Sequence, residues 1–225
     1  MTLDPQALKQ AAAQAAIQAI DAWLTPDAVI GVGTGSTADV FIDLLCAKRN
    51  RFKAAVASSE RTAKRLSQGG VTVLELNEVR SMPVYVDGAD EINRQGEMIK
   101  GGGGALTREK IVASVAQRFI CIVDQSKQVQ CLGKFALPIE VIPMAQQAIL
   151  RKCAALGGHA VVRSDFVTDN GNVIVDVSGL MVTNPVELER EINQWPGVVT
   201  NGIFAIRKAE LAFVASQSGV ARVEY

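Results

Sequence analysis

The chemistry of the chain concentrates in the stretch 81–110, where acids, a lysine and glycines crowd together. Three carboxylates fall within residues 87–91, directly after a short apolar strand, and Lys100 opens a run of four glycines. Clustered acids repel one another and consecutive glycines are costly to order, so stability alone does not explain the pattern. Carboxylates and ammonium groups move protons and stabilise oxyanions. The candidate residues are Asp87, Asp90, Glu91, Lys100, Glu109 and Lys127.

A loop at 31–37 has the composition of an anion-binding turn. It contains three glycines and three hydroxyls, between an apolar strand that starts at Ala28 and a helix that continues from Ala38. Glycines let the backbone approach a ligand, the amides of the helix start point at it, and hydroxyls can donate. The simpler interpretation is a tight turn with a Ser or Thr helix cap. Because the loop has more glycines and hydroxyls than a cap needs, we predict a phosphate site.

The same loop decides which phosphate ligand fits. A dinucleotide fingerprint would place a third glycine where Ser36 stands. Starting two residues later puts Ala38 there, which is tolerated, so a dinucleotide is not excluded. The next strand, 54–57, ends without the acidic residue that such sites carry, and Gly-Lys-Ser/Thr is absent. A small molecule with one phosphate therefore fits better than a nucleotide.

Composition narrows the remaining classes. The chain has 225 residues and a formal net charge of zero, which gives no bias toward nucleic acid or membrane. The start, Met1–Pro5, does not resemble a signal peptide, and no apolar run is long enough to span a bilayer. With His159 as the one histidine we expect no metal site and no cofactor. Four scattered cysteines, expected to be reduced, favour a cytoplasmic location: Cys46, Cys121, Cys131 and Cys153.

Two domains are expected from the order of the elements. Strands and helices alternate up to residue 127, which predicts an α/β, Rossmann-like and mostly parallel sheet with helices on both faces. The order β-α-β-β-α-β over 138–200 predicts an inserted ferredoxin-like α+β domain. The apolar runs in 211–223 are expected to return to the first sheet. The predicted boundaries are 1–132 with 205–225 for the catalytic domain, and 133–204 for a domain suited to oligomerisation.

Two local predictions are specific enough to check. We expect a strand at 71–74. We expect a helix over 104–117 that buries Ile111, Val112, Val115 and Ala116, since these recur at helical spacing.

The residue types suit proton transfer on a sugar phosphate. Aldose–ketose isomerisation moves a proton between C1 and C2 through an enediol. It needs a carboxylate base, a cation or proton donor for the developing oxyanion, and a grip on the phosphate. A base that works near neutral pH benefits from burial and like-charged neighbours. The alternative for the acidic run 87–91 alone is a solvated loop; its combination with Lys100 and the glycines favours a site.

Several motifs together resemble the ribose-5-phosphate isomerase A family, nearly end to end. The glycine loop, the acidic turn, the lysine–glycine run and the start of the following helix all match. One departure is Gly104, where the family more often has alanine, and we expect it to loosen the helix start slightly. The matching segments are 31–37, 85–91, 98–103, 105–110, 126–127, 132–134, 141–144 and 167–173.

The resemblance implies interconversion of D-ribose 5-phosphate and D-ribulose 5-phosphate, in the non-oxidative branch of the pentose phosphate pathway. It implies a metal-free enzyme, usually a homodimer and sometimes a tetramer. Carried over by motif, Glu109 is the base, and Asp87 and Asp90 assist ring opening and proton movement at the oxygens. Lys100 stabilises the enediolate, and Glu91 is left structural. Substrate contacts are implied for Lys9, Thr34, Gly35, Ser36, Thr37, Gly88, Ala89, Gly101, Gly102, Gly103 and Lys127.

Three other functions compete with this one. A sugar-phosphate sensor would carry a DNA-binding segment, for which the chain has no spare residues, and would not need Glu109. A nicotinamide oxidoreductase is weakened by the imperfect fingerprint. A sugar-phosphate deaminase or lactonase commonly uses histidine, and His159 lies in the inserted domain.

Overall fold

The computed structural model describes residues 4–225 and divides them into two compact units. Met1, Thr2 and Leu3, which begin the predicted first domain and the stretch judged not to be a signal peptide, lie outside the described residues. The first unit holds the described residues up to Gly88, with Arg108–Lys127 and Ala209–Tyr225. The second holds Ala89–Thr107 and Gln128–Lys208. Residues 89–107, 128–132 and 205–208, which we expected in the first domain, thus cluster with the second unit.

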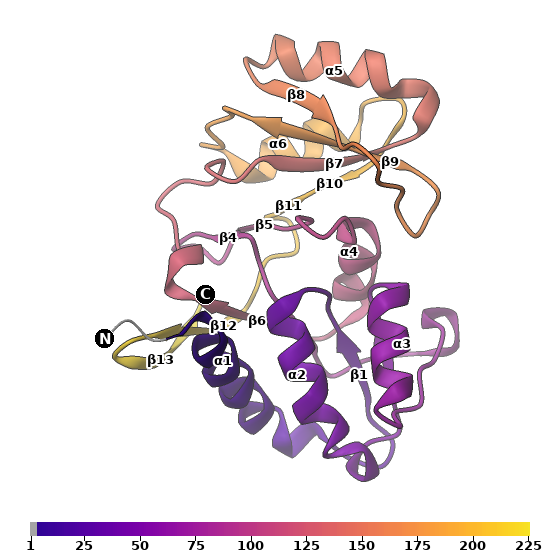
Figure 1. Cartoon of the computed structure of the whole chain (residues 1–225), viewed down its shortest axis with the longest axis vertical. Helices are drawn as coiled ribbons and strands as arrows, with labels where there is room; N and C mark the ends of the chain where they lie inside the picture. The colour runs from indigo at the N-terminus through magenta and orange to yellow at the C-terminus, as the bar shows by residue number, and fades with distance from the viewer. Residues whose placement is uncertain (1–3) are drawn as a thin grey trace. The chain divides into compact units, whose positions relative to one another are not determined.

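A six-stranded sheet forms the centre of the first unit, in the order β13-β12-β6-β3-β1-β2. Figure 1 labels β13, β12, β6 and β1. Neighbouring strands are parallel except at one edge, where β12 and β13 are antiparallel. The strand order reverses at β1, which pairs with β2 on one side and β3 on the other. In open sheets such a reversal leaves a crevice at the carboxyl ends of the strands, where ligands bind. The strands are β1 (Val29–Val32), β2 (Ala54–Ala57), β3 (Tyr85–Asp87), β6 (Phe119–Asp124), β12 (Leu211–Ser216) and β13 (Gly219–Glu224).

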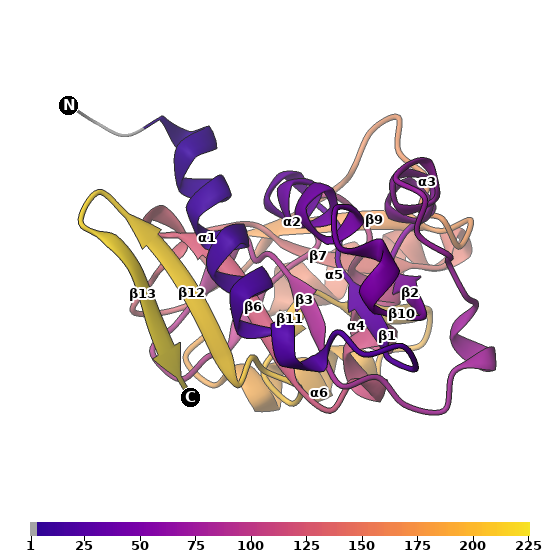
Figure 2. The ribbon, with the colours of Figure 1, turned by 90° about the horizontal axis from the view of Figure 1, so that it is seen from below.

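Helices flank this sheet, and α1, α2 and α3 lie along one side of it (Figure 2). Helix α1 packs on β6, β12 and α2 through small buried side chains such as Ala12 and Ala16, which allow close approach. Its start is fixed by Pro5 at the first position and by Asp4, whose side chain accepts from the Gln6 amide at 3.2 Å. The helices are α1 (Pro5–Ala19), α2 (Ser36–Cys46), α3 (Glu60–Gln68) and α4 (Leu106–Val115), with short 3₁₀ helices η1 (Asp21–Trp23), η2 (Arg49–Arg51), η3 (Leu76–Glu78) and η4 (Gln125–Lys127).

The second unit contains the predicted ferredoxin-like arrangement. Its four-stranded sheet has the order β10-β7-β9-β8, and every neighbouring pair is antiparallel. A smaller sheet, β11-β5-β4, was not expected from the sequence, because its strands have only two residues each. The elements are β4 (Glu91–Ile92), β5 (Met98–Ile99), β7 (Leu137–Val141), η5 (Pro143–Ala145), α5 (Gln146–Ala155), β8 (His159–Val162), β9 (Val173–Ser178), α6 (Pro185–Asn193), β10 (Val198–Asn201) and β11 (Ile203–Phe204).

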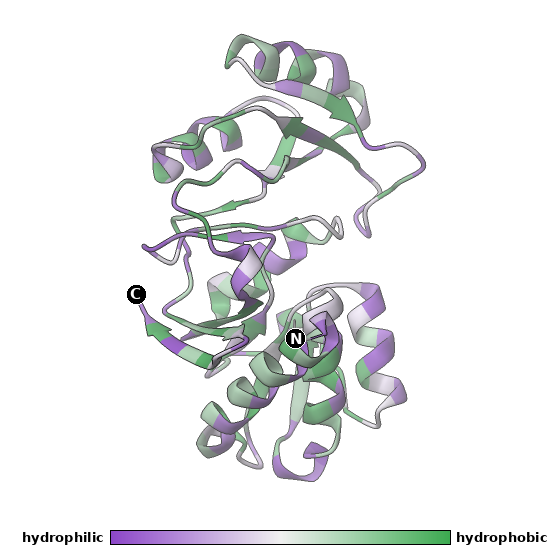
Figure 3. Cartoon of the chain, turned by 60° about the vertical axis from the view of Figure 1, so that its left-hand side comes forward, coloured by the Kyte–Doolittle hydropathy of each residue, from purple (hydrophilic) through white to green (hydrophobic). Residues whose placement is uncertain are grey.

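Each unit has its own apolar core. In the first, buried strand residues such as Ile30 and Ile122 meet the inner faces of α1 and α2. In the second, Ile139 and Val175 of the sheet meet Ile149 of α5. Hydrophobic colouring follows the strands of both sheets (Figure 3). The predicted fold class, a mostly parallel sheet flanked by helices with a ferredoxin-like addition, is confirmed.

One local prediction was wrong, and another was right only in part. Residues 71–74 form no strand; a single bridge joins Val73 to Ala55. In α4, Ile111 is 49% exposed and Val115 is 36% exposed. Val112 in the helix and Ala116 just after it are buried, as predicted, and Ala113, which was not predicted, is buried as well.

Within residues 4–225, no helix combines the length and the hydrophobicity that crossing a membrane requires.

Candidate active site

The anion loop of the first unit connects β1 to α2. Gly35 precedes the first helical residue with a φ of 129°, a conformation that favours glycine, and it has no side chain to cap the helix. The amides of the first turn therefore remain available to an anion, and the helix dipole adds partial positive charge. Ser36, the first residue of α2, is exposed, and Thr37 is half-buried. The loop thus has the backbone geometry predicted for a phosphate site.

The Thr34 hydroxyl fixes the loop by contacting a cluster of other hydroxyls. Its Oγ1 lies 2.9 Å from Ser58 Oγ, 2.8 Å from Ser59 Oγ and 3.1 Å from Thr62 Oγ1. The Thr62 hydroxyl also donates to the Gly33 carbonyl at 2.9 Å. Ser58, Ser59 and Thr62 were not predicted as site residues. Their signal was the pair of hydroxyls at the end of β2, the strand beside β1.

Asp87 ends β3 and lies directly beside this loop. It is 0% exposed. One carboxylate oxygen, Oδ1, accepts from the Thr34 amide at 3.0 Å and from the Gly88 amide at 2.7 Å. The predicted Thr34 and Asp87 are therefore brought together where the strand order reverses. Backbone donors of this kind favour a carboxylate in its charged form and in one orientation.

Gly33 makes this contact possible. A Cβ at this position would fall 1.9 Å from Asp87 Cγ, closer than any real contact. The backbone between β1 and α2 can approach Asp87 only because it carries no side chain there. Gly33 is thus needed for the position of Asp87 as well as for the anion loop.

Tyr85 holds the other oxygen of Asp87. Its hydroxyl donates to Asp87 Oδ2 at 2.5 Å, and its ring packs on Phe119 with centroids 5.0 Å apart. Burial raises the pKa of Tyr85 far above its usual value, and the charges of Asp87 and Glu109 raise it further. The phenol therefore stays protonated and acts as a donor. Tyr85 was predicted only as part of a buried strand.

Glu109 lies on α4 and is 3% exposed. Its charge acts on the Tyr85 phenol, which places it in the electrostatic neighbourhood of the Tyr85–Asp87 pair. A buried carboxylate near another acid suits a general base. Of the two predicted phosphate lysines, Lys127 ends η4 after β6 and Lys9 lies on α1, both half-buried.

In the second unit, Asp90 and the glycine run are joined. Asp90 Oδ2 accepts from the Gly102 amide at 2.8 Å, and a Cβ at Gly102 would fall 2.7 Å from Asp90 Oδ1. Gly102 and Gly103 are exposed, and Gly101 is buried with a φ of 107°. Ala89 precedes Asp90 and is half-buried.

Lys100 is buried next to the same run. It is 2% exposed, and its Nζ lies 5.5 Å from the centre of the Phe204 ring. Its amide donates to the Gly202 carbonyl at 2.9 Å, which fixes the backbone beside β11. A buried ammonium group is costly unless it is compensated by partners.

Glu91 has a structural role, as predicted. Its carboxylate accepts from the Gly133 amide at 2.8 Å and from the Phe135 amide at 2.5 Å. Both oxygens are thereby used to hold the chain that leads into β7.

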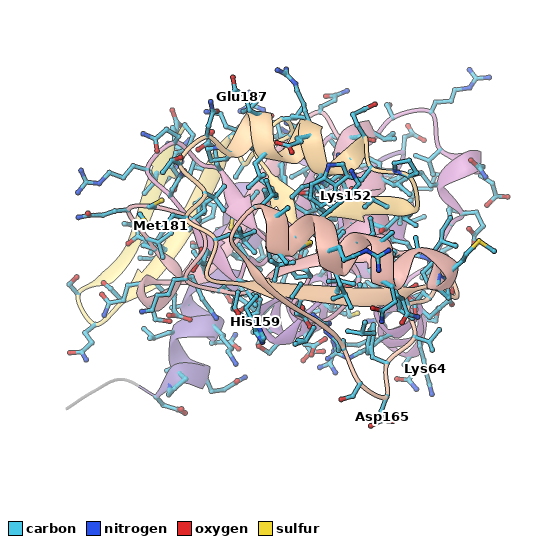
Figure 4. The ribbon with its side chains drawn as sticks, turned by 90° about the horizontal axis from the view of Figure 1, so that it is seen from above. Lys64, Lys152, His159, Asp165, Met181 and Glu187 are labelled. Atoms are coloured by element: carbon cyan, nitrogen blue, oxygen red, sulfur yellow. The ribbon has the colours of Figure 1, made fainter. Side chains whose placement is uncertain are left out.

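His159 belongs to the second unit. His159 is exposed at the start of β8, as Figure 4 shows. Within residues 4–225, no group of three or more His, Cys, Asp or Glu side chains is arranged to hold a metal ion.

The chain is similar to known ribose 5-phosphate isomerases A. The model of the ribose 5-phosphate isomerase A (phosphoriboisomerase A) family matches residues 54–219. Ribose-5-phosphate isomerase A of Bordetella petrii is 60% identical over 222 residues, which cover 99% of each chain. The protein of that name from Bordetella bronchiseptica is 57% identical, covering 99% of this chain and 98% of its own.

Solved structures agree. Ribose 5 phosphate isomerase A from Neisseria gonorrhoeae superposes with a TM-score of 0.94 at 40% identity, covering 100% of this chain and 99% of that one. A D-ribose-5-phosphate isomerase in complex with phospho-erythronic acid gives 0.93 at 35% identity, covering 99% and 100%.

The fold is a doubly wound α/β sheet with the buried Asp87 at the point where the strand order reverses. The chain belongs to the ribose 5-phosphate isomerase A family. The predicted enzyme class, an aldose–ketose isomerase of the ribose 5-phosphate type, is confirmed by this membership.

Proposed function

We propose that the protein interconverts D-ribose 5-phosphate and D-ribulose 5-phosphate through an enediol, with Glu109 as the group that moves the carbon-bound proton. The observation that carries this proposal is the burial of Glu109, 3% exposed, together with its charge, which helps to raise the pKa of the Tyr85 phenol. The phospho-erythronic acid complex of a relative with 35% identity supports a phosphorylated four- or five-carbon ligand.

One carboxylate carries out both proton transfers at carbon. The Glu109 carboxylate takes the proton from C2 of the open-chain aldose, and the electrons of the C2–H bond form the C1–C2 double bond. The C1 carbonyl oxygen then carries the negative charge, which the Lys100 ammonium offsets. The O2 hydrogen leaves as O1 gains one, and Glu109 returns its proton to C1.

The other acids work on the oxygens. Asp87 is held at both oxygens by donors, so it is oriented to exchange a proton with a sugar hydroxyl during ring opening. Asp90, held by the Gly102 amide, shares this task. Gly88, Ala89 and Gly101 to Gly103 supply backbone contacts to the sugar.

The phosphate is held in the first unit. Thr34 to Thr37 bind it through amides and hydroxyls at the start of α2, and Lys127 and Lys9 add positive charge.

The assay is ribulose 5-phosphate formed from ribose 5-phosphate, with ribose and glucosamine 6-phosphate as control substrates. We expect Glu109→Gln to lower kcat by about 10²–10⁴-fold, because one proton-transfer group is lost. Ribose 5-phosphate binding should persist, since the loop at 34–37 is unchanged. Glu224→Gln, which removes an exposed carboxylate of β13, is the matched control and should keep wild-type turnover. Near-full turnover by Glu109→Gln would refute the assignment of the base.

We also propose that catalysis needs no metal ion. Turnover should be unchanged after dialysis against excess chelator, because carboxylates and Lys100 supply the proton transfers and the charge stabilisation. Loss of turnover that returns on adding a divalent cation would contradict this.

Assembly and location complete the proposal. We propose a homodimer in which the second unit carries the contacts, supported by exposed apolar side chains there, such as Met181 at 78% and Val167 at 67% (Met181 is labelled in Figure 4). The mass in solution, from light scattering, tests it. We propose a cytoplasmic location, supported by the four free cysteines.

A further inference from the structure

Glu140 of β7 is a buried carboxylate that the proposed mechanism does not use. It is 0% exposed, and four side chains donate to it. Burying a carboxylate costs several kcal/mol unless hydrogen bonds compensate it. Four donors compensate this cost for Glu140, and the carboxylate in turn fixes the positions of those donors. The donors are Thr107 Oγ1, Thr168 Oγ1 at 2.9 Å, Asn170 Nδ2 at 3.1 Å and Asn172 Nδ2 at 2.8 Å.

These donors come from two places. Thr168, Asn170 and Asn172 belong to the loop 163–172, which leads from β8 to β9. Thr168 Oγ1 also accepts from the amides of Asn170 at 3.2 Å and Asn172 at 3.0 Å, so this loop closes on itself. Thr107 is different, because it lies in the first turn of α4. Glu140 therefore links a self-contained loop to the start of that helix.

The residues just before Thr107 are held independently. Arg163 makes a two-bond pair with Asp176, at 2.8 and 2.6 Å, and donates to the Gly102 carbonyl at 3.1 Å. The Phe166 ring fills the space where Gly104 has no side chain; a Cβ there would fall 2.1 Å from Phe166 Cζ. Gly104 has a φ of 79°, so glycine suits this turn. Asp165, at the tip of this loop, is labelled in Figure 4. Arg163 and Phe166 therefore hold the glycine run, whereas Glu140 holds Thr107.

We propose that Glu140 is a positioning residue for the isomerisation: through Thr107 it fixes the first turn of α4, which carries Glu109 two residues further on. The inference rests on the proposed role of Glu109 as the base. A hydroxyl bonded to a buried carboxylate sets both the rotation and the axial position of the turn. A displacement of about 1 Å at a reacting group can cost about 100-fold in rate, so an anchor of this kind has kinetic value.

If the hydrogen bonds to Glu140 only stabilised the fold, losses of kcat would follow losses of stability. Two matched variants distinguish this case from a positioning role. Thr107→Val and Thr168→Val each remove one hydroxyl donor to Glu140 and keep the β-branched shape. Thr168→Val also loses the two amide bonds that its oxygen accepts, so it should be the less stable variant. The Arg163–Asp176 pair remains intact in both.

We expect kcat to fall about tenfold or more in Thr107→Val, with KM within about threefold of wild type. Thr168→Val should keep kcat within about twofold although its melting temperature is lower. Thr107→Ser retains the hydroxyl and should restore kcat to within about threefold of wild type.

Kinetic losses that follow the loss of stability, largest in Thr168→Val, would overturn the proposal, as would wild-type kcat in Thr107→Val. The kcat of Glu109→Gln, measured in the same assay, distinguishes failure of the positioning role of Glu140 from failure of Glu109 as the base. If Glu109→Gln is inactive and Thr107→Val is normal, only the positioning role fails. If Glu109→Gln retains turnover, the proposed base fails first.

Discussion

The Tyr85 hydroxyl donates to Asp87 Oδ2 at 2.5 Å, and the two residues lie on the same strand, two positions apart. Side chains at such positions point to one face of a sheet, so a single strand supplies both the acid and its donor. Because the Asp87 Oδ1 atom is held by the Thr34 and Gly88 amides, every direction of rotation of this carboxylate breaks a hydrogen bond. The acid is oriented before any substrate arrives.

Removing this donor should slow catalysis. In Tyr85→Phe the ring still packs on Phe119, and the bond to Asp87 is lost. A hydrogen bond to a charged group contributes about 1.5–3 kcal/mol, so we expect kcat to fall roughly ten- to a hundredfold. Steady-state kinetics with ribose 5-phosphate measures it. The other tyrosine of the chain, Tyr225, gives the matched control, and Tyr225→Phe should leave kcat unchanged. Equal kcat in the two variants would remove the role given to the Tyr85 hydroxyl.

The two tyrosines also predict how stability depends on pH. Burial and the charge of Asp87 raise the pKa of Tyr85, and burial raises the pKa of Tyr225 to about 12. A tyrosine in the unfolded chain ionises near pH 10, whereas the folded protein keeps both phenols protonated there. The stabilising contribution is therefore complete below pH 10 and is lost as pH rises above it.

The free energy of unfolding in urea should fall above pH 10 by at most about 1.4 kcal/mol per pH unit for each tyrosine. Cys153, whose pKa burial raises to about 11, has the same sign, so the comparison must be between variants. The decline should be shallower in Tyr85→Phe than in wild type. An identical pH dependence in both proteins would contradict the shifted pKa of Tyr85.

Gly33→Ala should abolish the arrangement around Asp87. The new Cβ would fall 1.9 Å from Asp87 Cγ, so the carboxylate must leave its donors. We expect kcat/KM to fall by about 100-fold or more, together with a loss of about 1–3 kcal/mol of stability from overpacking. Gly158→Ala is the control, because it brings a Cβ within 2.6 Å of Val177 in the second unit, at no candidate site residue. It should lose stability and keep kcat/KM; matching kinetic losses in the two variants would refute the specific effect.

The sequence predicted the pieces of the site better than their contacts. Asp87 and the loop at 31–37 were both expected at the carboxyl edge of a parallel sheet, because each follows a strand. Their direct contact depends on β3 lying next to β1, and the strand order is a tertiary property that local pattern does not encode. The hydroxyl cluster under Thr34 was missed for the same reason, since it requires β2 on the other side of β1.

Other errors arose from patterns that tertiary packing overrides. The apolar residues at 71–74 fit a strand, but only one bridge to Ala55 forms, so the segment stays irregular. In α4, Ile111 and Val115 are apolar yet exposed, whereas the smaller Ala113, which was not predicted, is buried. Residue size and polarity alone could not select between these faces. Tyr85 was overlooked because an aromatic residue in a strand is usually core, and here its ring is core while its hydroxyl serves the site.

The pairing of β12 with β6 has a consequence for synthesis. β6 ends at Asp124, and β12 begins at Leu211, after the whole of the second unit has been made. While the chain emerges from its N-terminal end, β6 must wait for its parallel neighbour until residues 128–208 have been translated. The ferredoxin-like strands β7 to β10 have no such delay, since their partners all lie within residues 137–201. Non-local parallel pairing forms slowly, so the catalytic sheet should be the last part of the protein to mature on the ribosome.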